Sequence, residues 1–202
     1  MRIEKMETSL PLRERLRSIR LLAMDVDGVL TDGSVIYDSE GRELKSFNVS
    51  DGLGIVLLRR CDIKVAWISG RKSAIVEKRG RELGVDVLLQ GVYDKRLALA
   101  DACNLLDIPQ DAVAYVGDDW NDLPAFAFAG VCIAVANAVD EIKEAADVIT
   151  QNYGGKGAIR EVCNSILAAQ ERRQACLESY LTSLIGVSKE ERGQGLPDLF
   201  GQ

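Results

Sequence analysis

Four short motifs stand out because each combines residue types that could take part in catalysis. They are DVDGVLT at residues 25–31, ISGR at 68–71, YDK at 93–95 and GDDWND at 117–122. Each lies at the end of a short apolar segment that is typical of a buried strand. In an open sheet of parallel strands, ligands bind at the carboxyl ends of the strands. We therefore expect the four motifs to converge on one site.

The residue types indicate which chemistry such a site could perform. Clustered carboxylates repel one another near neutral pH unless a cation lies among them or some are protonated, and five candidates are present: Asp25, Asp27, Asp118, Asp119 and Asp122. Oxygen ligands without histidine or cysteine favour Mg²⁺. The hydroxyl of Ser69 and the charge of Lys95 suit the oxygens of a phosphoryl group. The motifs together indicate a phosphate site beside a magnesium ion.

Composition excludes several other classes of protein. The chain has no histidine, which removes Ser-His-Asp and Cys-His nucleophiles and histidine-ligated zinc. The net charge is −6, from 25 basic and 31 acidic residues, which argues against a nucleic acid or an anionic membrane as the main partner. No segment has the length of a signal peptide core or a membrane span. The five cysteines show no C-x-x-C spacing, so we expect reduced thiols and a cytoplasmic protein.

The apolar segments alternate with amphipathic ones along the chain. Strand-like segments are IRLLAMD, IKVAWISG, VDVLLQG, AVAYVGDD, VCIAVAN and ADVIT, and helices are expected at 72–83, 95–106 and 121–129. This alternation predicts an α/β fold, a Rossmann-like doubly wound parallel sheet. The segment 33–49 breaks the pattern and predicts a β-hairpin flap beside the site. No insertion is long enough to form a cap domain.

This pattern divides the chain into three segments. Residues 1–18 are expected to form an N-terminal helical extension, residues 19–170 the main domain, and residues 171–202 the end of a C-terminal helix and a mobile tail. The glycines of the segment GGKGAIREV allow either close backbone approach to a ligand or an ordinary loop before a helix.

The motifs resemble those of the haloacid dehalogenase-like phosphatases over roughly residues 20–165. Their D-x-D-x-[VT], Ser/Thr, Lys and G-D-D-x-x-D motifs match 25–29, Ser69, Lys95 and 117–122. The resemblance implies that Asp25 attacks phosphorus to form an aspartyl phosphate, while Asp27 protonates the leaving alcohol and later activates water. It also implies Mg²⁺ held by the Asp25 carboxylate, the Asp27 carbonyl and Asp118, with Asp119 and Asp122 as supporting acids.

Longer segments, including DVDGVLTDG, FNVSDGLGI and VAYVGDDWNDLP, resemble the capless branch of 3-deoxy-D-manno-octulosonate 8-phosphate phosphatases. This likeness implies hydrolysis of that phosphorylated sugar acid in lipopolysaccharide precursor synthesis, and a homotetramer built around the hairpins. The implied contacts with the sugar acid are Asn48, Ser50, Asp51, Gly52, Arg71 and Arg79, and Lys95 contacts the phosphate. Many relatives have arginine where this chain has Ser50, and some where it has Val56, so two possible partners for the substrate carboxylate are missing.

Three alternatives remain at this stage. A nonulosonate 9-phosphate phosphatase is disfavoured by Arg71, because the resemblance suggests that those enzymes often lack an arginine there. A phosphoacceptor receiver domain would carry its acceptor carboxylate alone on a middle strand. A catalytically silent, phosphatase-like assembly domain is disfavoured by the intact Asp25, Asp27, Lys95 and Asp118.

Overall fold

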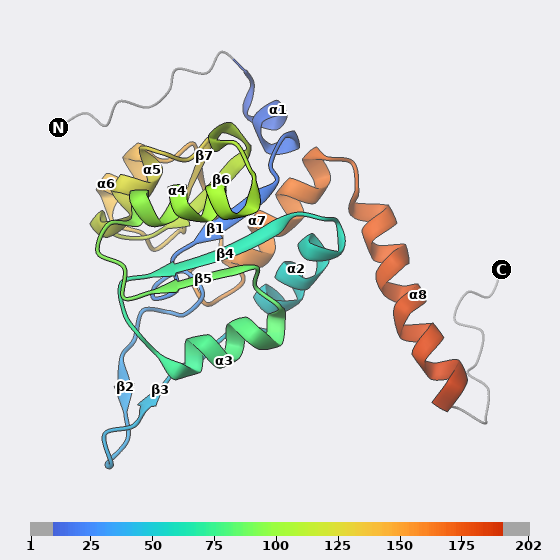
Figure 1. The fold of residues 1–202 in the computed structure, drawn as a ribbon, viewed down its shortest axis with the longest axis horizontal. Coiled ribbons are helices and arrows are strands. Elements are labelled where there is room, and N and C mark those ends of the chain that lie inside the picture. The colour runs from blue at the N-terminus through green and yellow to red at the C-terminus, as the bar shows by residue number, and fades with distance from the viewer. Residues whose placement is uncertain (1–9, 192–202) are drawn as a thin grey trace.

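Six parallel strands form the central sheet of the computed structural model, which describes residues 10–191 (Figure 1). Their order is β5-β4-β1-β6-β7-β8. The bounds are Leu21–Met24 for β1, Lys64–Ser69 for β4, Val87–Gln90 for β5, Val113–Gly117 for β6, Val131–Ala134 for β7 and Val148–Ile149 for β8. Every strand lies inside one of the predicted apolar segments. The predicted α/β parallel sheet is therefore confirmed.

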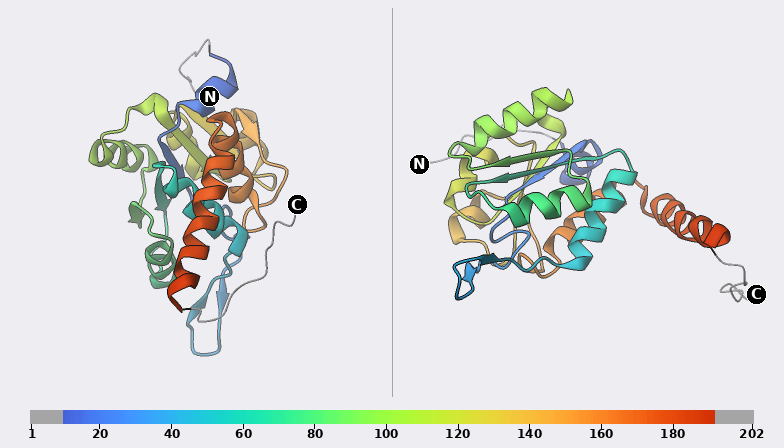
Figure 2. Two further views of the ribbon diagram at one scale, coloured as in Figure 1. Left: turned by 90° about the vertical axis from the view of Figure 1, so that its right-hand side faces the viewer. Right: turned by 60° about the horizontal axis from the view of Figure 1, so that its bottom comes forward.

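Helices cover both faces of this sheet. On one face lie α2 (Val49–Arg60), α3 (Ala74–Leu83) and α7 (Ala158–Ala169), and α4 (Lys95–Leu106) lies on the other (Figure 2). The short helices α5 (Leu123–Phe126) and α6 (Asp140–Ala145) continue the layer of α4, and α1 (Leu12–Arg17) packs against α7. Two 3₁₀ turns, η1 (Gln110–Ala112) and η2 (Trp120–Asp122), flank β6. The sheet is thus covered on both sides, as a parallel sheet requires.

The predicted helices differ in how closely they match. Helix α4 has the predicted bounds, because Asp94 caps its first turn and Asp107 ends it in a left-handed conformation before Pro109. Helix α3 begins at Ala74, two residues after the predicted start, with Ser73 at its N-cap position. The prediction for 121–129 was partly wrong. A capping box closes 119–122 into η2, and the short helix α5, which has Pro124 in its first turn, ends at Phe126.

The strand order places a topological switch beside β1. The chain moves outward from β1 to β4 and β5, then returns to the other side of β1 to form β6. Helices on opposite faces leave a crevice at such a point, above the carboxyl ends of the two strands. The backbone N–H of Asp25 donates to the carbonyl of Val116 across this point, at 3.0 Å. The motifs that follow β1 and β6 are therefore held side by side.

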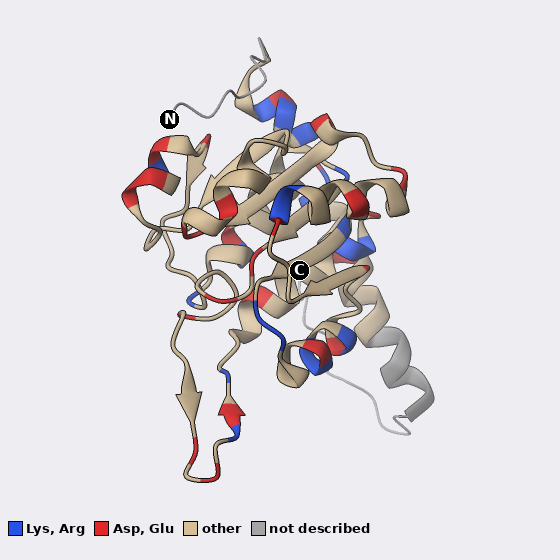
Figure 3. Ribbon diagram, turned by 60° about the vertical axis from the view of Figure 1, so that its left-hand side comes forward, with Lys and Arg blue, Asp and Glu red and all other residues tan. Residues whose placement is uncertain are grey.

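The predicted hairpin projects from the domain between β1 and α2. Strands β2 (Ile36–Tyr37) and β3 (Glu43–Leu44) pair antiparallel, with Ile36 opposite Leu44 (Figure 1). Its apolar residues Val35, Ile36 and Tyr37 are 48%, 47% and 60% exposed. Acidic and basic positions are interspersed along it (Figure 3). Within residues 10–191 no further folded unit interrupts the domain, which agrees with the predicted absence of a cap.

The two ends of the chain extend beyond the sheet. Helix α1 falls inside the predicted N-terminal extension. Helix α8 (Arg173–Glu191) leaves the domain after α7 (Figure 1). The expected mobile tail includes 192–202, which lie outside the described residues, and the predicted domain boundaries stay predictions. No helix within 10–191 is both long and apolar enough to cross a membrane.

Candidate active site

Asp25 lies directly after β1, where its carboxylate is buried and paired. It is 4% exposed, and its Oδ2 atom lies 2.8 Å from the ammonium of Lys95 at the start of α4. Its Oδ1 atom accepts a hydrogen bond from the backbone N–H of Val26 at 2.6 Å. The same ammonium lies 2.6 Å from Asp122 Oδ1. Lys95 therefore joins the motifs that follow three different strands.

Asp122 organises the loop that carries the other acidic residues. Its Oδ1 atom also accepts a hydrogen bond from the hydroxyl of Tyr115 at 2.8 Å, and its Oδ2 atom accepts from the backbone N–H of Asp118 at 2.9 Å and of Asp119 at 3.4 Å. Asp119 in turn accepts from the N–H of Trp120 at 2.7 Å. Because both oxygens of Asp122 are engaged, this carboxylate fixes the backbone of the loop, while the side chain of Asp118 faces Asp25.

The acidic cluster fits a hard cation. Carboxylate oxygens of Asp25, Asp118 and Asp122 lie within 4.8 Å of one another, and Asp118 Oδ1 is buried without a hydrogen-bond partner among the described residues. Burial, together with the charge of Asp122, raises the pKa of Asp25 to about 7 despite Lys95. Burial, Asp122 and Asp25 raise the pKa of Asp118 to about 8. Without more positive charge nearby, the carboxyl groups of Asp25 and Asp118 thus keep their protons to unusually high pH.

Magnesium should stabilise this protein more strongly at alkaline than at acidic pH. Because both pKa values are raised from 3.8, the native protein binds protons that the unfolded chain releases, and the stability of the metal-free protein falls as pH rises toward about 8. A cation has to displace those protons at low pH. We expect saturating Mg²⁺ to raise the melting temperature by several degrees more at about pH 8.5 than at about pH 6. An equal rise at both pH values would contradict this, and Asp118→Asn should remove most of the rise.

Two glycines allow the loops of the site to approach closely. Gly28 has a φ of +92°, and a Cβ atom there would lie 1.9 Å from Asp118 Oδ2. A Cβ atom on Gly154 would lie 1.7 Å from the carbonyl oxygen of Gly28, and the N–H of Gly155 donates to the carbonyl of Val29 at 2.9 Å. The segment GGKGAIREV therefore packs its glycine backbone against the loop after β1, which favours the interpretation of these glycines as a structural loop.

A cavity of about 260 Å³ opens above these residues. Its lining includes Asp25, Asp27, Ser69, Arg71, Asp118 and Asp119. The hydroxyl oxygen of Ser69 accepts from the N–H of Arg71 at 3.1 Å. Lys95 and Asp122 are buried next to Asp25. The structure thus brings together the four motifs as expected.

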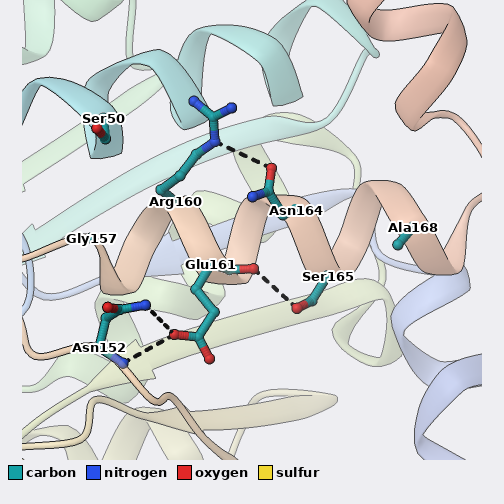
Figure 4. A pocket seen from close by; sticks show the side chains of 8 residues that line it. All are labelled: Ser50, Asn152, Gly157, Arg160, Glu161, Asn164, Ser165 and Ala168. Carbon is teal, nitrogen blue, oxygen red and sulfur yellow. Dashed lines mark hydrogen bonds between the residues drawn. The ribbon is translucent and has the colours of Figure 1, made fainter.

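The predicted residues at the start of α2 do not line this cavity. Asn48 caps α2, accepting from the N–H of Ser50 at 2.7 Å and of Asp51 at 3.3 Å. Asp51 is buried and accepts from the N–H of Arg160 at 2.7 Å and of Gly157 at 3.3 Å, so it caps α7. Ser50 lines a separate groove of about 460 Å³ beside α7 (Figure 4). The side chains of Asn48 and Asp51 thus cap helices, and the contacts of this segment with a sugar acid stay predictions.

Arg79 also lies apart from the cavity. It lies on α3 against Gly52, where a Cβ atom would lie 2.5 Å from Arg79 Nη2. Arg79 pairs with Glu82 at 3.2 Å, and its Nε atom is buried without a partner among the described residues. Of the two arginines predicted to bind the substrate carboxylate, only Arg71 lines the cavity.

Three polar residues near the site were not predicted. Tyr115 supports Asp122. The ammonium of Lys45 pairs with Asp27 Oδ1, and Glu43 accepts hydrogen bonds from Arg71 Nη2 at 2.7 Å and from the Ser73 hydroxyl at 2.6 Å. The Ser73 hydroxyl, together with Lys45 and Arg71, holds the pKa of Glu43 below its usual range. Alternation along a strand places residues i and i+2 on one side, so Glu43 and Lys45 could have been recognised as a same-side pair of the hairpin.

Comparison with known proteins gives the family. A model of the haloacid dehalogenase-like hydrolases matches residues 62–161. A 3-deoxy-D-manno-octulosonate 8-phosphate phosphatase of Haemophilus influenzae is 44% identical over 159 residues, which are 79% of this chain and 88% of the relative. The phosphatase of the same name from Escherichia coli K12 is 46% identical over 156 residues, 77% of this chain and 83% of the relative.

A solved structure agrees. The crystal structure of a 3-deoxy-D-manno-octulosonate 8-phosphate phosphatase from Moraxella catarrhalis, in complex with a magnesium ion, a phosphate ion and a KDO molecule, superposes with a TM-score of 0.81. It is 44% identical, and the match covers 83% of this chain and 97% of that one. The chain therefore belongs to the haloacid dehalogenase-like hydrolases. Its relatives place it among the phosphoric monoester hydrolases, as the motifs predicted.

Proposed function

We propose that the protein is a Mg²⁺-dependent phosphatase that hydrolyses 3-deoxy-D-manno-octulosonate 8-phosphate to the free sugar acid and phosphate. The observation that carries this proposal is the buried Asp25 paired to Lys95, at the floor of a cavity whose rim carries Arg71. The relatives of the same name support the choice of substrate. The reaction would belong to lipopolysaccharide precursor synthesis.

In the proposed reaction Asp25 is the nucleophile. Its carboxylate attacks phosphorus, and the bond to the leaving alcohol breaks as Asp27 donates a proton to that oxygen. Asp27 then takes a proton from water, which hydrolyses the aspartyl phosphate and frees Asp25. Lys95 and Ser69 stabilise negative charge on the phosphoryl oxygens. Receiver domains use similar residue types, but the chain belongs to a hydrolase family and its D-x-D motif follows β1, the first strand in chain order.

Asp25, Asp118 and the backbone carbonyl of Asp27 would hold the magnesium ion. The donor set supports this choice, because it offers only oxygens and because Asp118 Oδ1 lacks a hydrogen-bond partner. A bound cation there would neutralise charge on the phosphoryl group and on Asp25.

Arg71 supports a substrate that carries a second anion. Its guanidinium lies at the cavity rim, and its hydrogen bond to Tyr37 and the neighbouring carboxylate of Glu43 raise its pKa, so it remains charged. A guanidinium can bind a carboxylate through two parallel hydrogen bonds. Retention of Arg71 also favours the eight-carbon acid over a nonulosonate 9-phosphate, which is the second candidate. The intact Asp25, Asp27, Lys95 and Asp118 argue against a silent assembly domain.

A panel of phosphate esters tests the substrate. The octulosonate 8-phosphate should be hydrolysed with a kcat/KM at least about 100-fold above that of glucose 6-phosphate, which has no carboxylate. Arg71→Ala should lower the first value and leave the second nearly unchanged. Equal values for the two esters would exclude a sugar-acid phosphatase while preserving the phosphatase chemistry. A higher value for a nonulosonate 9-phosphate would establish the second candidate.

We also propose a cytoplasmic homotetramer that packs through the hairpins. The exposed apolar residues of 35–37 support packing against other subunits, since exposed apolar surface of this kind favours association. All five cysteines are buried thiols, in keeping with a reducing compartment. Sedimentation of the full chain measures the number of subunits directly.

A further inference from the structure

Lys45 is a buried cation that pairs, within residues 10–191, with a carboxylate of the site and a carboxylate of the hairpin. It follows β3, and its side chain is 1% exposed. Its ammonium pairs with Asp27 Oδ1 and lies 3.6 Å from Glu43 Oε1. Burying an ammonium is costly unless its partners are well placed. Here the buried ammonium pairs with Asp27, the residue that would act as general acid and base. The position of Lys45 therefore indicates a role in the reaction.

The ion pair with Lys45 gives the two carboxylate oxygens of Asp27 different surroundings. Lys45 occupies Oδ1, whereas Oδ2 is buried and has no hydrogen-bond partner among the described residues. Asp27 also lines the cavity that contains Asp25. With Oδ1 held, the carboxyl group keeps one orientation, and Oδ2 is the oxygen left to exchange a proton with a bound ester.

Glu43 fixes Lys45 in turn. Besides Lys45, it binds the Ser73 hydroxyl at 2.6 Å and the Arg71 guanidinium at 2.7 Å, so one carboxylate connects the hairpin with the loop between β4 and α3. Lys45 is thereby held within the hairpin, and through Lys45 the hairpin contacts Asp27. The contacts form a continuous chain from the hairpin to the proposed acid.

We propose that Lys45 is a positioning residue that orients Asp27 so that Oδ2 transfers the proton. This rests on the proposed function. In the first step the proton on Oδ2 moves to the bridging ester oxygen as its bond to phosphorus breaks and a bond from Asp25 to phosphorus forms. In the second step a water oxygen bonds to phosphorus, its proton returns to Oδ2, and Asp25 is released. The sum is ester plus water to alcohol plus phosphate.

The leaving group of the ester separates this role from a purely structural one. An alkyl phosphate such as a sugar phosphate needs a proton on its leaving oxygen, whereas p-nitrophenyl phosphate releases a stable phenolate without one. The second step is common to both esters, so the comparison is made in kcat/KM, which reports the first step. A misplaced Asp27 should lower kcat/KM for the first ester and spare that for the second. A hairpin that is merely loosened should affect both alike.

The experiment measures kcat/KM for both esters in Lys45→Met, Lys45→Arg and Asp27→Asn. We expect Lys45→Met to lower kcat/KM for the sugar-acid phosphate at least about 10-fold, and kcat/KM for p-nitrophenyl phosphate less than about 3-fold. Lys45→Arg keeps a donor for Oδ1 and should recover most of the loss. Lys78→Met, at an exposed lysine of α3, is the matched control and should change neither value. If Lys45→Met does not fold, Glu43→Gln, which weakens the anchor of Lys45, should give a smaller selective loss.

Each outcome bears on a different statement. Equal losses for the two esters, or no loss for either, would overturn the positioning role. If Asp27→Asn is selective for the sugar-acid phosphate while Lys45→Met is not, the role of Lys45 fails and the proposed function stands. If the wild-type protein hydrolyses neither ester, or Asp27→Asn spares both, it is the proposed function that fails.

Discussion

Asp25→Asn should abolish turnover while leaving a folded protein. Within residues 10–191, Asp25 is the one carboxylate that both pairs with Lys95 and lines the cavity, and an amide is a poor nucleophile toward phosphorus. We expect kcat to fall by more than about 10³-fold. The substitution also removes one negative charge from a crowded cluster, so the melting temperature of the metal-free protein at about pH 8 should not fall substantially.

A direct assay identifies the attacking atom. Rapid quenching of the wild-type protein during turnover, followed by peptide mass analysis, should find a phosphoryl group on the peptide that contains Asp25. Asp140→Asn is a suitable control, because Asp140 is a 93% exposed carboxylate at the start of α6. Near wild-type activity in a folded Asp25→Asn protein would remove the nucleophile assignment.

Lys95→Met should produce the largest loss of stability. Burial alone would lower the pKa of Lys95, but the carboxylates of Asp122 and Asp25 outweigh burial and raise it, so the ammonium stays charged between them. Removing it leaves two buried carboxylates without their cation. We expect the free energy of unfolding near pH 8 to fall by about 3–5 kcal/mol, measured by urea denaturation of the metal-free protein.

The pH dependence of that loss provides a second check. The loss should be smaller near pH 5, where Asp25 is protonated because its pKa is raised to about 7. Lys143→Met removes a partly exposed lysine that lies 4.0 Å from Asp140, and it should change stability by less than about 0.5 kcal/mol. A loss for Lys95→Met no larger than that of Lys143→Met would show that the cluster does not depend on this cation.

The sheet and the centre of the site could be predicted from the sequence because their signals are local. Buried parallel strands appear as short continuous apolar segments, and Leu21–Met24 is 0% exposed at each residue. A carboxylate directly after such a strand has a defined place at the sheet edge. The strand order then brings Asp25 and Asp118 together, although they lie 93 positions apart in the sequence.

Contacts between distant helices are less visible in the sequence. Asp51 caps α7 from a position in α2, and nothing near Asp51 in the sequence indicates that bond to Arg160. The contact between Lys45 and Asp27 requires the hairpin to fold back over the exit of β1. Helix ends posed a similar difficulty at 121–129, where a capping box and Pro124 divide a segment that appears continuously helical.

Because the N–H of Gly155 donates a hydrogen bond to Val29, hydrogen exchange at Gly155 can measure motion of the loop that follows β1. An amide proton exchanges with solvent only when its hydrogen bond opens. The N–H of Gly155 is bonded to the carbonyl two residues after Asp27. Its exchange rate therefore reports how often the loop carrying both proposed catalytic carboxylates separates from its support, in a region remote in sequence from either of them.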